Sequence, residues 1–133
     1  MRRQSVLALV AVAVFVAMPV GAFGQVPLSV GAYVDSSATC GQASNSVLMW
    51  WNGRYFSMGR MSNVVPHPTR TRNRYIGSIV WIAENPPPPP ERVMITILSG
   101  QSYKWKSAYG SSVLRFCPDR TLPEMWRGMT PRQ

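Results

Sequence analysis

The residues with the most definite chemistry in this sequence are two cysteines, Cys40 and Cys117. In an oxidising compartment an even number of cysteines indicates a disulfide, and two cysteines allow a single pairing. Closing a loop of this length contributes roughly 4–5 kcal/mol to stability in the chain-entropy model. The alternative is a metal site that adds His67, the one histidine of the sequence. Structural zinc usually needs a close ligand pair such as Cys-x-x-Cys. Because the sequence has no such pair, we expect a Cys40–Cys117 disulfide and no metal or cofactor.

The alternating arginines Arg70, Arg72 and Arg74 form the charge cluster with the most regular spacing. They follow Pro66 and Pro68, and proline disfavours helix for the residue before it, so we expect an extended or irregular segment. An extended chain would point these side chains to one side at intervals of about 7 Å. Guanidinium groups make bidentate contacts with phosphates and carboxylates. The cluster is therefore a candidate anion-binding site, and a solvated surface loop is the alternative.

The other reactive residues do not form a catalytic pattern that can be recognised in the sequence. His67 lies between prolines, and there is no Gly-x-Ser-x-Gly motif and no glycine-rich phosphate loop. The acidic residues are scattered through predicted turns, with no neighbouring pair for acid–base chemistry. They are Asp35, Glu84, Glu91, Asp119 and Glu124. We therefore expect no catalytic residues and a protein that is not an enzyme.

The start of the chain predicts export. Arg2 and Arg3 form a basic segment, residues 6–20 form an uncharged apolar run, and small residues follow. This is the layout of a secretory signal peptide, with cleavage after Ala22 or Gly24. The alternative is a membrane anchor, but a span needs about 20 apolar residues and this run is shorter. We expect residues 1–24 to be a cleavable helical signal peptide, and the mature protein to be periplasmic or secreted without a transmembrane anchor.

The net charge of the sequence indicates which kinds of partner the protein would attract. The formal net charge of +9 falls to +7 when Arg2 and Arg3 are removed with the signal peptide. A positive charge of this size outside the cytoplasm attracts anionic polymers or lipid head groups, and the alternative is that it only maintains solubility. Nucleic acid is not an expected partner because the protein is exported.

The segments 75–83, 93–98, 101–106 and 113–117 have the composition of β-strands, because they are rich in β-branched and aromatic residues or alternate in polarity. In the third of them, Tyr103 and Trp105 share one face and Lys104 and Lys106 the other. Turn signals separate the segments, including the proline run at 86–90, for which we expect a stiff connector, or alternatively a docking site for an aromatic groove. The pattern predicts an antiparallel meander.

The remaining segments complete the predicted domain. A first strand is predicted over residues 31–34. Asn52-Gly53 between two apolar runs predicts a hairpin with a type I′ turn. We expect an edge strand over 59–65 and, after Cys117, one turn that lays Leu122, Met125 and Trp126 over an open end of the sheet. Residues 25–127 should form a single all-β domain, a small antiparallel barrel or strongly curved sheet of six to eight short strands. Residues 128–133 should be a frayed tail.

Both ends of the mature chain resemble a family of small exported proteobacterial proteins of uncharacterised function. At the front, the resemblance lies in Gly31-x-Tyr33, Cys40, Ala43-Ser44-Asn45 and Asn52-Gly53. At the end, it lies in Phe116-Cys117-Pro118 and Leu122-Pro123-Glu124-x-Trp126. The resemblance implies a compact periplasmic β-domain with a cysteine pair and transfers no catalytic residue.

These observations favour a non-catalytic exported envelope protein. Its expected partner is an anionic surface component, either an envelope polymer or lipid head groups, or a partner protein, bound through Arg70, Arg72 and Arg74. The alternative is a periplasmic inhibitor of a hydrolase, although a basic target such as lysozyme would be repelled. A small hydrolase is the third possibility, and it would require a pocket that unites His67 with a carboxylate and a hydroxyl.

Overall fold

The computed structural model describes residues 26–82 and 84–129, which fold into a single all-β sheet. The predicted signal peptide lies outside these residues. The strands are β1 (Gly31–Asp35), β2 (Leu48–Trp51), β3 (Phe56–Ser57), β4 (His67–Pro68), β5 (Arg74–Ile79), β6 (Glu91–Ser99), β7 (Ser102–Ser107) and β8 (Gly110–Cys117). Short 3₁₀ turns are η1 (Cys40–Gln42), η2 (Asp119–Thr121) and η3 (Glu124–Trp126). The predicted all-β class is confirmed.

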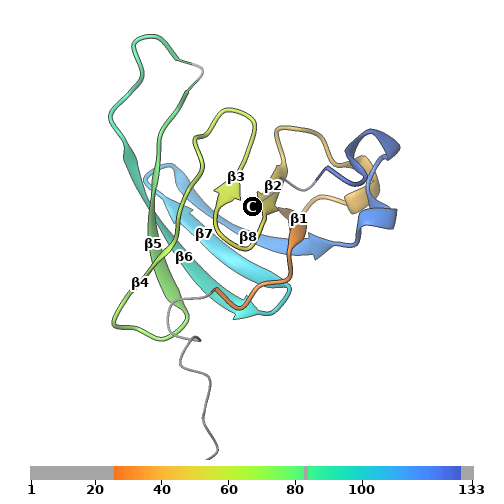
Figure 1. Cartoon of the computed structure of the whole chain (residues 1–133), viewed down its shortest axis with the longest axis horizontal. Helices are drawn as coiled ribbons and strands as arrows, with labels where there is room; N and C mark the ends of the chain where they lie inside the picture. Colours follow the sequence, from red (N-terminus) through yellow and green to blue (C-terminus); the bar gives the residue numbers. More distant parts are fainter. Residues whose placement is uncertain (1–25, 83, 130–133) are drawn as a thin grey trace, which may run out of the picture.

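All strand pairs are antiparallel, in the order β3-β2-β1-β8-β7-β6-β5-β4, and the sheet curls strongly into a half-barrel (Figure 1). The predicted meander forms β5 to β8. The segment predicted as a strand over 75–83 ends at Ile79, because Trp81 pairs instead with Met61 on another segment. The long connection from β5 to β6, which contains the prolines, extends away from the sheet in Figure 1.

The hairpin predicted at Asn52-Gly53 is present, but its turn is longer than expected. Trp51 pairs with Phe56, which leaves four residues between the strands. The side-chain oxygen Oδ1 of Asn52 accepts the backbone N–H groups of Arg54 and Tyr55, each at 2.9 Å. Gly53 has a positive φ of 96° and Asn52 does not. The type I′ prediction is therefore wrong, since that turn requires positive φ at both central residues.

The edge strand predicted over 59–65 is also wrong. This segment pairs briefly with two different edges, Val64 with Phe56 and Met61 with Trp81. The N–H of Ser62 donates to the carbonyl of Val80 at 2.6 Å. Residues 58–65 therefore cross the opening of the half-barrel between the β3 side and the end of β5. Gly77 leaves the space for this crossing, because a Cβ there would lie 2.5 Å from Cγ1 of Val64.

The concave face of the half-barrel holds the main core. Inward residues of β1, β2, β6, β7 and β8 meet side chains of the crossing segment and of the lead-in before β1. Phe56 lies at its centre, with ring centroids 4.5 Å from Trp51, 5.1 Å from Tyr103 and 5.8 Å from Trp105. Such aromatic pairs add about 0.5–1.5 kcal/mol each beyond the area they bury.

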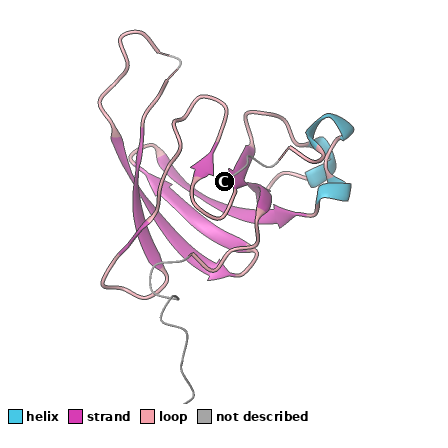
Figure 2. Ribbon diagram, viewed as in Figure 1, coloured by secondary structure: helices cyan, strands magenta, loops and turns pink. Residues whose placement is uncertain are grey.

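A second core covers the convex face, but only over β1, β2 and β8. It comprises the outward residues Ala32, Val34, Leu48, Trp50 and Cys117, together with Ala43 and Leu122 from the connecting segments. Cys40 and Cys117 are joined with an S–S distance of 2.08 Å, as predicted. The disulfide fastens the loop that contains η1 to the end of β8. We call the segments 36–47 and 118–127 the cover. Figure 2 shows its 3₁₀ turns gathered at one end of the molecule.

The segment after Cys117 follows its prediction only in part. Leu122 is buried and Trp126 packs against the second core, but Met125 is exposed because η3 turns its side chain to solvent. The N–H of Gly128, in the predicted tail, donates to Oδ1 of Asp119 at 2.7 Å. Residues 130–133 lie outside the described residues.

Candidate functional site

The predicted arginine cluster is not a straight ladder. The strand β4 ends at Pro68, and the chain then turns, with Thr69 N–H donating to the carbonyl of Arg74 at 3.1 Å. Arg70 and Arg72 therefore lie in the β4–β5 turn, and Arg74 is the first residue of β5. All three side chains are exposed. Of the two predicted alternatives, extended or irregular, the structure shows the irregular one, because Asn73 adopts a positive φ of 73°, which reverses the chain.

The structure places Arg74 beside other cations on the convex face of β5, β6 and β7. Arg74 is opposite Thr96 on β6, and Thr96 is opposite Lys104 on β7. Lys106 is two residues further along the same strand, on the same face as Lys104. On β6, Arg92 follows the same outward phase, since Val93 and Ile95 are buried in the core. We call Arg74, Arg92, Lys104 and Lys106 the cationic face. From ordinary sheet spacings its Cα atoms lie within about 15 Å of one another.

No carboxylate interrupts the outward positions of these three strands. Glu91 begins β6 in the inward phase, and its Oε1 accepts the N–H of Ala108 at 2.9 Å. The other acids lie at the end of β1, in the β5–β6 connection, and in η2 and η3. Apolar side chains lie beside the cations, on β6 and on the neighbouring strand β8. Met94 and Val113 are each 36% exposed and Leu98 is 53% exposed.

Arg115 has a different position, at the boundary between the cationic face and the cover. It projects from β8 opposite Val34 of β1. Its guanidinium group donates to the carbonyl of Ala38, and at 3.2 Å to the sulfur of Cys40. This arginine therefore fastens the cover and does not add to the free cations.

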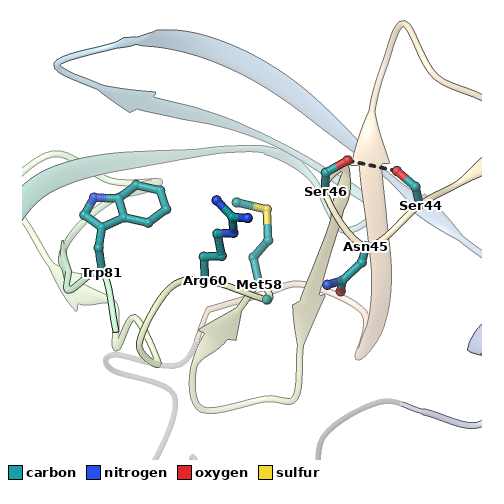
Figure 3. A pocket seen from close by; sticks show the side chains of 7 residues that line it. Ser44, Asn45, Ser46, Met58, Arg60 and Trp81 are labelled. Atoms are coloured by element: carbon teal, nitrogen blue, oxygen red, sulfur yellow. Dashed lines mark hydrogen bonds between the residues drawn. The ribbon is translucent and has the colours of Figure 1, made fainter. Parts of the chain in front are cut away.

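A separate cavity of about 610 Å³ lies where the crossing segment meets the end of β5 and the loop before β2. Its walls come from Ser44, Asn45, Ser46, Met58, Gly59, Arg60 and Trp81. In Figure 3, Arg60 stands between Trp81 and Met58, and the serines form the facing wall. The Oγ atoms of Ser44 and Ser46 are hydrogen-bonded at 2.9 Å. We call this the Trp81 cavity.

Two smaller cavities adjoin this region. One of about 250 Å³ shares Arg60 and Trp81, and adds Glu84 and Tyr109. Another, of about 400 Å³, opens beside the cover between Asp35 and Trp105. The hydroxyl and N–H of Ser37 both donate to Oδ1 of Asp35. These hydrogen bonds, with a further one from Ser112, lower the pKa of Asp35.

Two buried tyrosines contribute no reactive group. Burial raises the pKa of Tyr33, whose hydroxyl donates to the carbonyl of Ser29 at 2.7 Å. Burial, with the nearby Tyr33, also raises the pKa of Tyr103. The hydroxyl of Tyr103 has no hydrogen-bond partner within the described part of the chain. Both phenols therefore stay neutral at ordinary pH.

His67 is exposed on β4, opposite Ile76, and lines none of the cavities described above. The loop predicted around it is thus a short edge strand, which tolerates Pro68 because its outer side is unpaired. Across residues 26–82 and 84–129, no group of histidine, cysteine, aspartate and glutamate is arranged to hold a metal ion. The same residues contain no helix long and apolar enough to cross a membrane.

Neither the extent of the cationic face nor the Trp81 cavity was predicted from the sequence. The outward phase of Lys104 and Lys106 was visible in the alternation of their strand. Arg92 was missed because the neighbouring strand begins at Glu91, two residues before the predicted segment 93–98. The Trp81 cavity had no such signal. Arg60 and Trp81 lie in different predicted strands, and only the irregular crossing of residues 58–65 brings them together.

Comparisons with protein-family models, curated proteins and solved structures gave no match for this chain. The resemblance to small exported proteobacterial proteins therefore stays a prediction.

Proposed function

We propose that this is a non-catalytic exported protein that binds an anionic lipid surface of the cell envelope through its cationic face. The observation that carries the proposal is the bare convex surface of β5, β6 and β7, where Arg74, Arg92, Lys104 and Lys106 lie without a carboxylate among them. Arg70 and Arg72, in the turn that leads into β5, extend the same positive region. The disulfide is compatible with a periplasmic or extracellular location.

Lipid head groups suit this face better than a soluble polymer. Met94 and Leu98 are exposed on β6, which also carries Arg92, and Val113 is exposed on β8 opposite Lys104. A surface that alternates basic and apolar side chains gains from both anionic head groups and the acyl boundary beneath them. Each lysine or arginine near such a surface contributes about 1 kcal/mol. Removing two lysines should therefore weaken binding by about 2 kcal/mol, or roughly 30-fold.

The test is sedimentation of the purified protein with vesicles of phosphatidylglycerol and phosphatidylcholine, and with phosphatidylcholine vesicles alone. We expect binding to the anionic vesicles only, decreasing as salt is raised. The variant Lys104→Gln/Lys106→Gln should lose most of this binding. The matched control is Arg54→Gln/Arg120→Gln, which removes the same charge from exposed positions outside the cationic face. Equal loss in both variants would contradict the proposal, because it would show that net charge alone decides binding.

A further inference from the structure

The Trp81 cavity combines features that suit a ligand different from a lipid head group. Its volume of about 610 Å³ lies within the range of about 300–1,000 Å³ that small-molecule sites occupy. None of the residues of the cationic face lines it. It is therefore a second site, and its ligand must be argued from its own walls.

Trp81 supplies a fixed aromatic wall. Its ring is half-buried and packs against the main core, while the remaining surface lines the cavity. The backbone on both sides is held, since Ser62 N–H donates to Val80 and Ile82 N–H donates to the carbonyl of Arg60 at 3.3 Å. The face of an indole ring is electron-rich, so it attracts the polarised C–H groups on one face of a sugar ring.

Arg60 supplies a positive charge beside this wall. Its side chain is exposed, and no carboxylate lines the Trp81 cavity. Glu84 lines the neighbouring cavity of about 250 Å³, which shares Arg60 and Trp81. The guanidinium group can therefore present its donors to a ligand in the Trp81 cavity. A carboxylate is the group that such a planar fork binds bidentately.

The facing wall supplies neutral donors and acceptors. Ser44 and Ser46 offer hydroxyls, and Asn45 offers an amide. The Asn45 side chain packs over Gly59, since a Cβ at Gly59 would lie 2.6 Å from its Nδ2. Hydroxyl and amide groups that line the same cavity as an aromatic wall match the hydroxyls around a sugar ring. Together, these walls lead us to propose that the Trp81 cavity binds an acidic sugar unit, with the ring on Trp81 and its carboxylate on Arg60.

The experiment compares two probes that differ only in the carboxylate. Calorimetry measures the binding of trigalacturonic acid and of its methyl ester to the purified protein, with polyphosphate as an anion that is not a sugar. We expect the acid to bind at least tenfold more tightly than the ester, and polyphosphate not to compete for the cavity. Nuclear magnetic resonance of the indole N–H signals should show the shift at Trp81.

Two variants locate the site. Arg60→Gln, an exposed change that leaves the core intact, should remove the preference for the acid over the ester. Trp81→Phe should weaken both probes while keeping that preference. The Lys104→Gln/Lys106→Gln variant should leave the preference unchanged, and this separates the inference from the lipid-binding proposal. Equal affinity for acid and ester, competition by polyphosphate, or a preference that survives Arg60→Gln would each overturn the inference.

Discussion

The convex side of this half-barrel has two halves with opposite surfaces. Over β1, β2 and β8, the cover lies on outward side chains that are apolar and makes a second core. Over β5, β6 and β7, the outward residues are basic, polar or isolated apolar residues, and they are exposed or partly exposed. The difference follows from the disulfide and the proline-containing segment after it, which keep the end of the chain on one half. A domain of this size can therefore bury one half for stability and leave the other free for binding.

Removing the disulfide, which holds the cover on one half, should cause the largest loss of stability. The variant Cys40→Ser/Cys117→Ser frees a loop with a sequence separation of 77 residues. The chain-entropy model gives a loss of about 4 kcal/mol in unfolding free energy. Urea denaturation followed by tryptophan fluorescence measures it. Reduced wild-type protein serves as the control and should unfold at a similar concentration. A loss below about 1 kcal/mol would show that the cover is held by packing alone.

A matched pair of truncations compares the two halves directly. Leu122→Ala removes a side chain that is 2% exposed in the cover, and should cost about 2–4 kcal/mol. Met94→Ala removes a side chain that is 36% exposed on the bare half, and should stay within about 0.5 kcal/mol. Thermal and urea unfolding of both variants measure the difference. Similar losses at the two positions would mean that the halves do not differ as described.

Arg115 tests the boundary between the halves. Arg115→Met keeps most of the side-chain stem but removes the donors to Ala38 and Cys40. We expect a loss of about 1–2 kcal/mol, smaller than that of a core truncation because the site is only partly buried. The same change at Arg92, which lies on β6 opposite Ser78 of β5 and away from the cover, should cost little stability and instead reduce vesicle binding. A reversed pattern, with Arg115 important for binding and Arg92 for stability, would contradict the assignment of the boundary.

Lowering the pH should reduce the stability of the fold, and this effect should be smaller than those of the substitutions above. The pKa of Asp35 is lowered in the folded state by hydrogen bonds from Ser37. Asp35 therefore stabilises the fold above the ordinary aspartate pKa of about 3.9, and this contribution is lost as the pH falls through the lower folded value. Asp35→Asn should reduce stability slightly at pH 6–7 and not at all below the folded pKa. A difference that instead grows in acid would contradict this sign.

The sequence predicted the sheet well and its irregular parts poorly. The alternation in 101–106 and the β-branched run in 93–98 depend on burial of one face, so their strands and phases could be read directly. The crossing of residues 58–65 could not be predicted from the sequence. It depends on Gly77, on the distant strand β5, which leaves space for Val64. The Asn52-Gly53 hairpin was predicted, but the side chain of Asn52 caps a longer turn. The two sites differ in the same way. The cationic face could be predicted in part from the alternation of its strands, whereas the Trp81 cavity could not, because the irregular crossing forms it.

The most direct measurement of the central claim uses the two lysines of the sequence, Lys104 and Lys106, which both lie on the cationic face. Acetylation of their amines, followed by mass spectrometry, compares the free protein with the protein bound to phosphatidylglycerol vesicles. The N-terminal amine provides an internal reference. If the bare half is the binding surface, both lysines should be strongly protected when the vesicles are bound. Unchanged labelling of both lysines in the bound protein would contradict the account.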